Sequence, residues 1–263
     1  EMFTGSFAKR LDSLCHIHVK EAILVPQAGI VDYTTVSLKY SEKIRALGGE
    51  ILTNFKVNQI IRSKSDIVIR SSDAREISGS ILVNCAGLYS DKVAQMTGMP
   101  LPPLQIIPFR GEYYDLKPDK QYLVNHLIYP VPNPDFPFLG VHFTRMIGGG
   151  IEAGPNAVLA FKREGYSRWD IDAKELAETL FFPGFRRLAT KHWQHGLGEL
   201  HRSFSSAAFV KALRHLIPEI NEEDLVRGGA GVRAMATDNL GNMSDDFFIL
   251  ISHQRTMTRN ILF

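Results

Sequence analysis

Hydrophobic and polar positions alternate with a helical period over residues 34–49. The apolar positions of this stretch are Val36, Tyr40, Ile44 and Leu47. Residues spaced by three or four lie on one face of a helix, so the pattern predicts an amphipathic helix. We expect Thr34 or Thr35 to cap its start and the Gly48–Gly49 pair to end it.

Short apolar runs surround this helix. Residues 21–33 begin with an apolar run and continue into a Pro/Gly turn, and the β-branched residues of 57–61 and 67–69 are typical of strands. LVNCAGLYSDKVAQMTG, residues 82–98, predicts a buried strand, a tight turn of small residues and a short helix. Strands that alternate with helices indicate an α/β layer arrangement.

The pattern changes at Leu104. Residues 104–116, 125–132 and 138–150 are strand-like, with alternating polarity and breaks at Pro or Gly, which predicts a mixed or antiparallel sheet. We expect the main later helices at 173–182 and 203–220. The glycine-rich stretch 227–242 is expected to form turns and short strands.

Composition excludes several classes of protein. Lys and Arg exceed Asp and Glu by 30 − 28 = 2, which predicts no strong attraction to nucleic acid. Two cysteines cannot form a disulfide framework, and we expect Cys85 to be a buried thiol. The first twenty residues lack a signal-peptide core. The chain begins with Glu, and we expect it to be truncated.

The glycine-rich and histidine-rich motifs support neither a phosphate loop nor a metal site. IGGGIEAGP, residues 147–155, precedes no helix-forming run and predicts a hairpin or bulge. His192 and His195, with His201 nearby, lack the further ligands that zinc requires, and a solvated face of a loop or helix is the simpler interpretation. We therefore expect no metal.

Five segments together carry a family resemblance. They are ILVNCAGLYSDKVAQMTG, IIPFRGEYYDL, VNHLIYPVPNPDFPFLGVHFTRM, GPNAVLAFKREGY and AGVRAMATDNLGNMSDDFFI. The chain resembles the L-2-hydroxyglutarate dehydrogenases/oxidases, which belong to the D-amino-acid-oxidase-like superfamily of FAD-dependent oxidoreductases. The resemblance covers about Glu21 to Leu250. The family's initial G-x-G-x-x-G segment and its final flavin-covering segment have no match here.

The resemblance implies an α/β (α+β) fold with an incomplete FAD-binding Rossmann-like domain and a mixed or antiparallel-sheet substrate domain. Residues 21–103, with contributions near 225–250, would form part of the FAD-binding domain. Residues 104–224 would form the substrate domain, and 1–20 and 251–263 are divergent ends.

The resemblance also implies FAD as cofactor and oxidation of (S)-2-hydroxyglutarate to 2-oxoglutarate by hydride transfer to the flavin. The residues expected near the cofactor are Val57, Cys85, Ala86 and Gly87. Arg233 matches the arginine that holds the α-carboxylate, with a structural ion pair as the alternative. The family's catalytic histidine has no counterpart in this chain.

Further polar residues on the predicted strands are candidates for contact with the substrate. Arg110 and Arg145 are candidates for the distal carboxylate, with surface or salt-bridge roles as the alternative. Tyr113, Tyr129 and His142 are candidates for orienting the substrate hydroxyl, with satisfied core polar groups as the alternative.

Three questions stay open from the sequence. The chain could be an inactive remnant, a dicarboxylate-binding or interaction protein without flavin, or another oxidase such as a glycine or sarcosine oxidase or a glycerol-3-phosphate dehydrogenase. The electron acceptor would be oxygen or a quinone, the latter with peripheral membrane association. The location would be the cytoplasm or inner membrane surface in a bacterium and the mitochondrion in a eukaryote.

Overall fold

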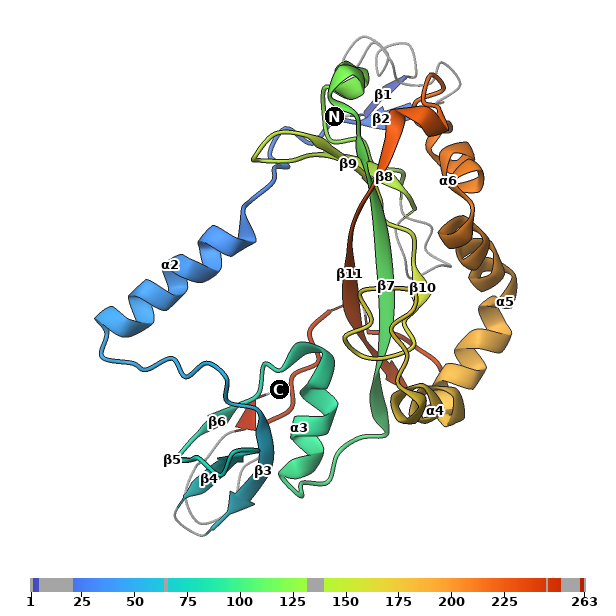
Figure 1. Ribbon diagram of the computed structural model, residues 1–263. Coiled ribbons are helices and arrows are strands. Elements are labelled where there is room, and N and C mark those ends of the chain that lie inside the picture. Colours follow the sequence, from blue (N-terminus) through green and yellow to red (C-terminus); the bar gives the residue numbers. More distant parts are fainter. Residues whose placement is uncertain are drawn as a thin grey trace. The chain divides into compact units, whose positions relative to one another are not determined.

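The computed structural model describes residues 2–4, 21–63, 66–131, 140–244, 246–251 and 261–262. The chain divides into two compact units, each assembled from three segments (Figure 1). Unit 1 contains Glu1–Val36, Phe109–Leu159 and His192–Gly231. Unit 2 contains Ser37–Pro108, Ala160–Lys191 and Val232–Phe263. Strands β7 (Leu104–Leu116) and β11 (Leu225–Asp238) each contribute residues to both units.

The principal sheet has the strand order β10-β7-β9-β8, and β11 pairs with β7. The short strands are β8 (His142–Arg145), β9 (Ile151–Gly154) and β10 (Val158–Leu159). The pairs that β9 forms with β7 and with β8 are antiparallel, as is the β10–β7 pair. The predicted mixed or antiparallel sheet is therefore confirmed.

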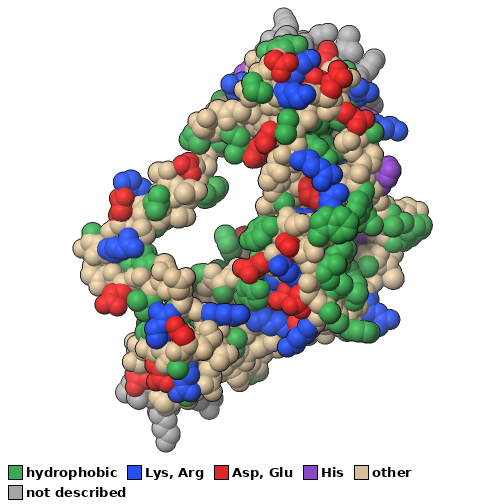
Figure 2. Space-filling view, in the orientation of Figure 1, with side chains coloured by type: hydrophobic (Ala, Val, Ile, Leu, Met, Phe, Trp, Pro, Cys, Tyr) green, Lys and Arg blue, Asp and Glu red, His purple; other side chains and the backbone are tan. Residues whose placement is uncertain are grey.

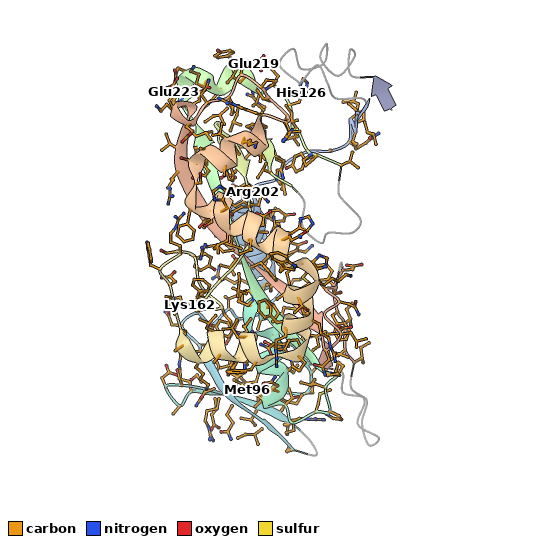
Figure 3. The ribbon with its side chains drawn as sticks, turned by 90° about the vertical axis from the view of Figure 1, so that its right-hand side faces the viewer. Met96, His126, Lys162, Arg202, Glu219 and Glu223 are labelled. Atoms are coloured by element: carbon orange, nitrogen blue, oxygen red, sulfur yellow. The ribbon has the colours of Figure 1, made fainter. Side chains whose placement is uncertain are left out.

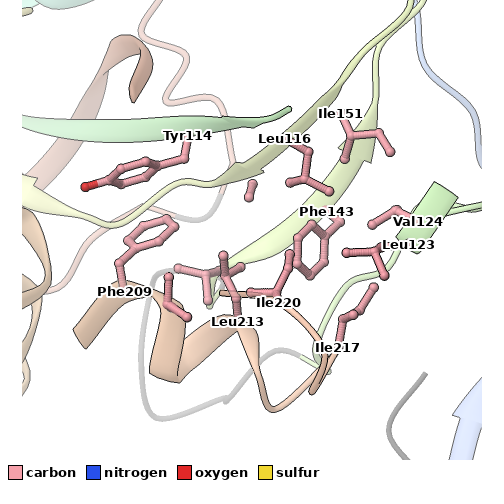
Figure 4. Packing of buried hydrophobic residues seen from close by; sticks show 13 residues of the cluster. Tyr114, Leu116, Leu123, Val124, Phe143, Ile151, Phe209, Leu213, Ile217 and Ile220 are labelled. Atoms are coloured by element: carbon pink, nitrogen blue, oxygen red, sulfur yellow. The ribbon is translucent and has the colours of Figure 1, made fainter. Parts of the chain in front are cut away.

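Unit 1 has an apolar core between this sheet and helix α6 (Ser206–Leu213). The Ser205 side chain caps α6 by accepting a hydrogen bond from the Ala208 N–H at 3.2 Å. Phe209 and Leu213 are fully buried, and the ring of Phe209 lies 4.6 Å from that of Tyr114 on β7 (Figure 4). The 3₁₀ turns η2 (Pro118–Leu123) and η3 (Glu222–Asp224) complete this unit.

Unit 2 contains a three-stranded antiparallel meander of β3 (Val57–Arg62), β4 (Ile67–Ser71) and β5 (Glu76–Gly79). The apolar cluster at this meander is small: Ile60 and Ile67 are buried, with partly buried neighbours that include Leu82 and Val93. Strand β6 (Leu82–Val83) pairs in parallel with β12 (Ile261–Leu262).

Helices α3 (Ser90–Met96) and α4 (Ala173–Phe181) also belong to unit 2. Asp172 caps α4, because its Oδ1 accepts hydrogen bonds from the N–H groups of Lys174 and Glu175. The helix predicted at 173–182 is thus confirmed.

The predicted first helix is confirmed as α2 (Tyr33–Ala46), but its expected cap is wrong. The carboxylate of Asp32, one residue earlier, accepts hydrogen bonds from the N–H groups of Thr34 and Thr35. None of the α2 side chains is buried. Strands β1 (Met2–Thr4) and β2 (Glu21–Ile23) pair antiparallel.

Two further predictions of local structure are wrong. Residues 225–238 form one long strand, β11, in place of turns and short strands. A Cβ at Gly228 would lie 3.1 Å from an Asp115 carboxylate oxygen and 3.3 Å from the Tyr113 carbonyl oxygen, so the close approach of β7 favours glycine at this position. Residues 183–204 form helix α5 (Pro183–Phe204), which the hydrophobic pattern did not predict. The helix predicted at 203–220 is shorter, because α6 ends at Leu213.

Candidate active site

The predicted strand–turn–helix of residues 82–98 is formed by β6, the 3₁₀ turn η1 (Gly87–Tyr89) and α3. The buried Asn84 side chain forms hydrogen bonds with the backbone both before and after the 3₁₀ turn. Its Oδ1 accepts a hydrogen bond from the Ala86 N–H at 3.1 Å, and its Nδ2 donates to the Ser90 carbonyl at 2.8 Å. This side chain therefore fixes the path of the turn.

The turn itself is open to solvent. Cys85, Ala86 and Gly87 are exposed, so the prediction of a buried Cys85 is wrong. Burial of Asn84 explains this, because the next side chain of an extended chain points to the opposite face. Gly87 has φ +54°, and a Cβ there would meet no atom within 4 Å. The backbone of this turn is thus accessible to a ligand.

A buried ion pair holds the helix that follows. The guanidinium of Arg163 donates two hydrogen bonds to the Asp91 carboxylate, at 2.7 and 2.8 Å, and another to the Leu88 carbonyl. Asp91 also accepts a bond from the Ile106 N–H at 3.1 Å. Both charged side chains are about 3% exposed. This bidentate geometry satisfies the charges that burial would otherwise leave unpaired.

Tyr89, the last residue of η1, lies close to Arg163. The guanidinium carbon of Arg163 is 5.7 Å from the centre of the Tyr89 ring. Burial raises the pKa of the Tyr89 phenol, and the negative charges of Glu175 and Glu164 raise it further. Tyr89 therefore remains a neutral hydrogen-bonding group across the physiological range of pH.

A cavity of about 690 Å³ lies beside the turn within unit 2. Its walls are mainly apolar and include Val83, Ala94, Leu101, Leu104, Ala234 and Phe248. A volume and lining of this kind suit a largely apolar ligand held by a few polar groups. The exposed small-residue turn and the apolar walls fit one side of a flat ring system such as a flavin. Val57, the other expected cofactor residue, is partly buried at the start of β3.

Unit 1 brings Tyr129 and His142 together. Their rings stack with centres 4.1 Å apart and planes 20° apart. The Tyr129 hydroxyl shares a hydrogen bond of 2.8 Å with the Thr144 hydroxyl, and Nδ1 of the buried His142 lies 3.0 Å from the Gly140 carbonyl oxygen. Tyr129 is 45% exposed, so the pair has one solvent-facing and one buried member.

Arg110 has a carboxylate partner in the same unit. It is about 3% exposed, and its guanidinium lies 3.1 Å from Glu112 Oε1. Asn156 Nδ2 donates to the other oxygen of Glu112 at 3.1 Å, and Asn156 Oδ1 accepts from the Glu112 N–H at 2.8 Å. These partners, which the sequence did not indicate, make Arg110 part of a buried polar network.

The remaining candidates are more open. Arg145 is exposed at the end of β8, and one of its nitrogens donates to the Val124 carbonyl at 2.9 Å. Tyr113 is partly buried on β7. Both belong to unit 1, whereas Arg233, partly buried on β11, belongs to unit 2.

The glycine-rich and histidine-rich motifs of the sequence lie among the described residues. Residues 146–150 form the turn between β8 and β9, which confirms the predicted hairpin. The rings of His192 and His195 are 6.5 Å apart. Within the described ranges, no group of three or more metal-ligating side chains occurs, and no helix is both long and apolar enough to cross a bilayer. Cys15 lies outside the described residues.

Relatives in sequence point to one enzyme group. An L-2-hydroxyglutarate dehydrogenase of Indibacter alkaliphilus is 57% identical over 249 residues, which cover 93% of this chain and 62% of that protein. The human mitochondrial L-2-hydroxyglutarate dehydrogenase is 44% identical over 237 residues, which cover 86% of this chain and 51% of that protein. The chain thus spans between half and two thirds of the length of these relatives.

Solved structures agree on the fold. An L-α-glycerophosphate oxidase from Mycoplasma pneumoniae with bound FAD matches the whole chain and 58% of its own, at a TM-score of 0.70 and 16% identity. A glycine oxidase from Geobacillus kaustophilus matches the whole of this chain over 56% of its own length, at a TM-score of 0.61 and 14% identity. The model of the FAD-dependent oxidoreductase family (DAO) matches residues 1–256. The chain belongs to this family of FAD-dependent oxidoreductases.

Proposed function

We propose that this chain supplies one wall of the flavin site and much of the substrate site of an enzyme that oxidises (S)-2-hydroxyglutarate to 2-oxoglutarate. The observation that carries the proposal is the open Cys85–Gly87 turn beside an apolar cavity. The proposal is supported by the 57% identity to an L-2-hydroxyglutarate dehydrogenase, far above the 14–16% identity to the glycerophosphate and glycine oxidases.

The proposed division of labour follows the chain. Residues 21–103 and the stretch near 225–250 serve the flavin, and residues 104–224 serve the substrate. FAD, when bound, supplies the acceptor for the hydride that leaves C2. Cys85, Ala86 and Gly87 would line it closely because their side chains are small, and Val57 would lie toward its adenine end.

The substrate has two carboxylates, for which arginine is the best-suited side chain. In this proposal Arg233 holds the carboxylate next to C2. Of the two arginines considered for the distal carboxylate, Arg145 is exposed, whereas Arg110 is buried against Glu112. We therefore assign the distal carboxylate to Arg145 and a supporting role to Arg110.

The stacked Tyr129–His142 pair would orient the substrate hydroxyl, with Tyr113 beside it. The Tyr129 hydroxyl already shares a hydrogen bond with Thr144, which restricts the directions in which it can meet a ligand. A base outside this set of residues would take the proton of the substrate hydroxyl as the hydride leaves C2. Electrons would leave the reduced flavin for oxygen or for a quinone.

The test uses a chimera in which these 263 residues replace the matching segment of the Indibacter alkaliphilus L-2-hydroxyglutarate dehydrogenase, reconstituted with FAD. Stoichiometric flavin absorption and dye reduction with L-2-hydroxyglutarate, but not with glycine or glycerol 3-phosphate, would support the proposal. We expect Arg233→Ala to lower kcat/KM about 100-fold, the loss typical of one partner in a charge pair. Arg227→Ala, an exposed arginine on the same strand, is the control. Failure to bind flavin, or an unchanged kcat/KM in Arg233→Ala, would contradict the proposal.

A further inference from the structure

Strand β8 of unit 1 has an apolar face and a polar face. Phe143, in the middle of the strand, is fully buried in the apolar cluster, where Figure 4 shows its ring next to Ile220. Successive side chains of a strand point to opposite faces. His142 and Thr144, the two neighbours of Phe143, therefore share the other face of the sheet.

A backbone bridge aligns a second segment with this strand. The N–H and carbonyl groups of Ile128 and Phe143 exchange hydrogen bonds of 3.0 and 2.9 Å. In an antiparallel pairing the residues that flank such a pair also lie opposite each other. Tyr129 consequently lies opposite His142, with Thr144 as its diagonal neighbour on the same face.

Two contacts fix the phenol group of Tyr129. Its ring stacks on the imidazole of His142, with the ring centres 4.1 Å apart. A carbonyl oxygen can only accept a hydrogen bond, so Nδ1 of His142 carries the proton in its 3.0 Å contact with Gly140. The stack on this anchored imidazole sets the plane of the phenol, and the 2.8 Å bond to Thr144 Oγ1 sets the direction of its hydroxyl.

The hydroxyls of Tyr129 and Thr144 carry two protons, of which their shared bond uses one. Among the described residues, neither hydroxyl has another hydrogen-bond partner, and Tyr129 is exposed. Each hydroxyl can donate or accept, so the bond can run in either direction. With a carbonyl ligand, Thr144 donates to Tyr129 and Tyr129 donates to the ligand. With a ligand hydroxyl that donates, both bonds reverse, and in either case the two bonds strengthen each other.

Charges of both signs surround this end of unit 1. Figure 2 shows Lys or Arg and Asp or Glu side chains intermingled on the visible face where Figure 1 places β8, β9 and η2. Figure 3 shows His126, three residues before Tyr129, at the same end as Glu219 and Glu223. Intermingled charges produce little net field. Directed hydrogen bonds are therefore the means by which this face can distinguish similar anions.

We propose that Thr144 is a positioning residue that acts through Tyr129 and selects ligands with an oxygen at C2. A 2-hydroxy acid donates from that oxygen and a 2-oxo acid accepts there, and the reversible Thr144–Tyr129 bond matches both. This inference rests on the proposed function, in which Tyr129 meets the C2 oxygen. It adds that substrate and product are held by the same pair of hydroxyls in opposite directions.

The first experiment measures ligand binding to the FAD-loaded chimera by calorimetry. 2-Oxoglutarate and glutarate have the same two carboxylates, but glutarate lacks the oxygen at C2. Thr144→Val should weaken 2-oxoglutarate binding about threefold to tenfold, the effect of one net hydrogen bond, and leave glutarate binding unchanged. Thr144→Ser keeps the hydroxyl and should bind both ligands as the parent does. Thr190→Val, the same change at an exposed threonine of α5, is the control.

Equal losses for the two ligands in Thr144→Val would indicate a merely structural role and overturn the proposal. Unchanged binding of 2-oxoglutarate would overturn it too. A parent chimera that binds 2-oxoglutarate but reduces no dye with L-2-hydroxyglutarate would contradict the proposed function, while the ratio of the two affinities would still decide the role of Thr144.

The second experiment combines Thr144→Val with Tyr129→Phe. Tyr129→Phe removes the hydroxyl through which Thr144 acts, so the added valine should cause no further loss of 2-oxoglutarate binding. Additive losses in the double variant would show that Thr144 acts by another route and would overturn the proposal.

Discussion

The two units keep their shape by different means. In unit 1 one apolar cluster contains thirteen buried residues from the sheet and its ends, the η2 region, α6 and the segment that follows α6. In unit 2 the cluster at β3 and β4 has two buried members, Ile106 and Ile107 are buried on β7, and the turn beside the cavity is held by Asn84 and by the Asp91–Arg163 pair. Apolar packing tolerates small shifts, whereas directional polar contacts fix a backbone in one position. That difference suits the proposed role of unit 2, in which a backbone turn lies against the flavin.

The largest effect is expected in the core of unit 1. Phe209→Ala removes a fully buried ring that contacts Tyr114, so it should lower the free energy of unfolding by about 3–5 kcal/mol. Urea denaturation measures this loss. Val226→Ala, at a half-exposed position, should cost much less, and similar losses for the two variants would refute the importance of the cluster.

The next largest effect tests the buried Asp91–Arg163 ion pair of unit 2, which we call the polar clamp. Asp91→Asn leaves the Arg163 charge buried without its partner, which should cost about 3 kcal/mol. Hydrogen exchange followed by mass spectrometry should show the loss in unit 2, with unit 1 protected as before. Replacement of both residues, Asp91→Leu with Arg163→Met, should recover part of the stability, because it removes the unpaired charge but leaves the Ile106 N–H and the Leu88 carbonyl without these partners. Uniform loss of protection in both units would show that the clamp is not local.

Helix caps give a matched comparison of the two units. Asp172→Ala in unit 2 and Ser205→Ala in unit 1 should each cost about 1 kcal/mol. Asp172 accepts two backbone hydrogen bonds and Ser205 accepts one, so the first substitution should cost more. Thermal unfolding of the two variants provides the measurement, and the opposite order would contradict the hydrogen-bond argument.

The smallest effect is a dependence on pH in unit 1. Burial raises the pKa of Glu152, and the charge of Asp115, its partner across the β7–β9 pair, raises it further. A carboxyl group whose pKa is raised in the folded state contributes stability at low pH. This contribution is lost as the pH rises through that pKa. Glu152→Gln should therefore raise Tm at pH 7 and leave it unchanged at a pH well below the ordinary pKa of glutamate. An equal Tm difference at both values would contradict this.

The sequence predicts elements whose apolar face is buried or whose pattern is regular. Strand β7 occupies 104–116 as predicted, and α2 lies within its predicted range apart from its first residue. Helix α5 was missed because it contains glycine, a poor helix former, at Gly196, Gly198 and, in its first half, Gly184. A Cβ at Gly184 would collide with the Asp238 carbonyl. This reason for a glycine inside the helix is visible only in the folded chain.

Polar partnerships in the candidate site were not predictable for a related reason. Asp91 and Arg163 are 72 positions apart, and Glu112 and Asn156 are 44 apart. No local pattern records such pairs, because each is made by the folding of distant segments. The resemblance, by contrast, rests on whole segments, and the family it indicated is confirmed.

The core of unit 1 also has a consequence for synthesis on the ribosome. Tyr114 and Leu116 emerge well before Phe209, Leu213 and Ile220, which cover them in the finished protein. For roughly a hundred residues of elongation, this apolar face of β7 has no α6 to pack against. The burial of this strand face therefore waits until the later helix is translated.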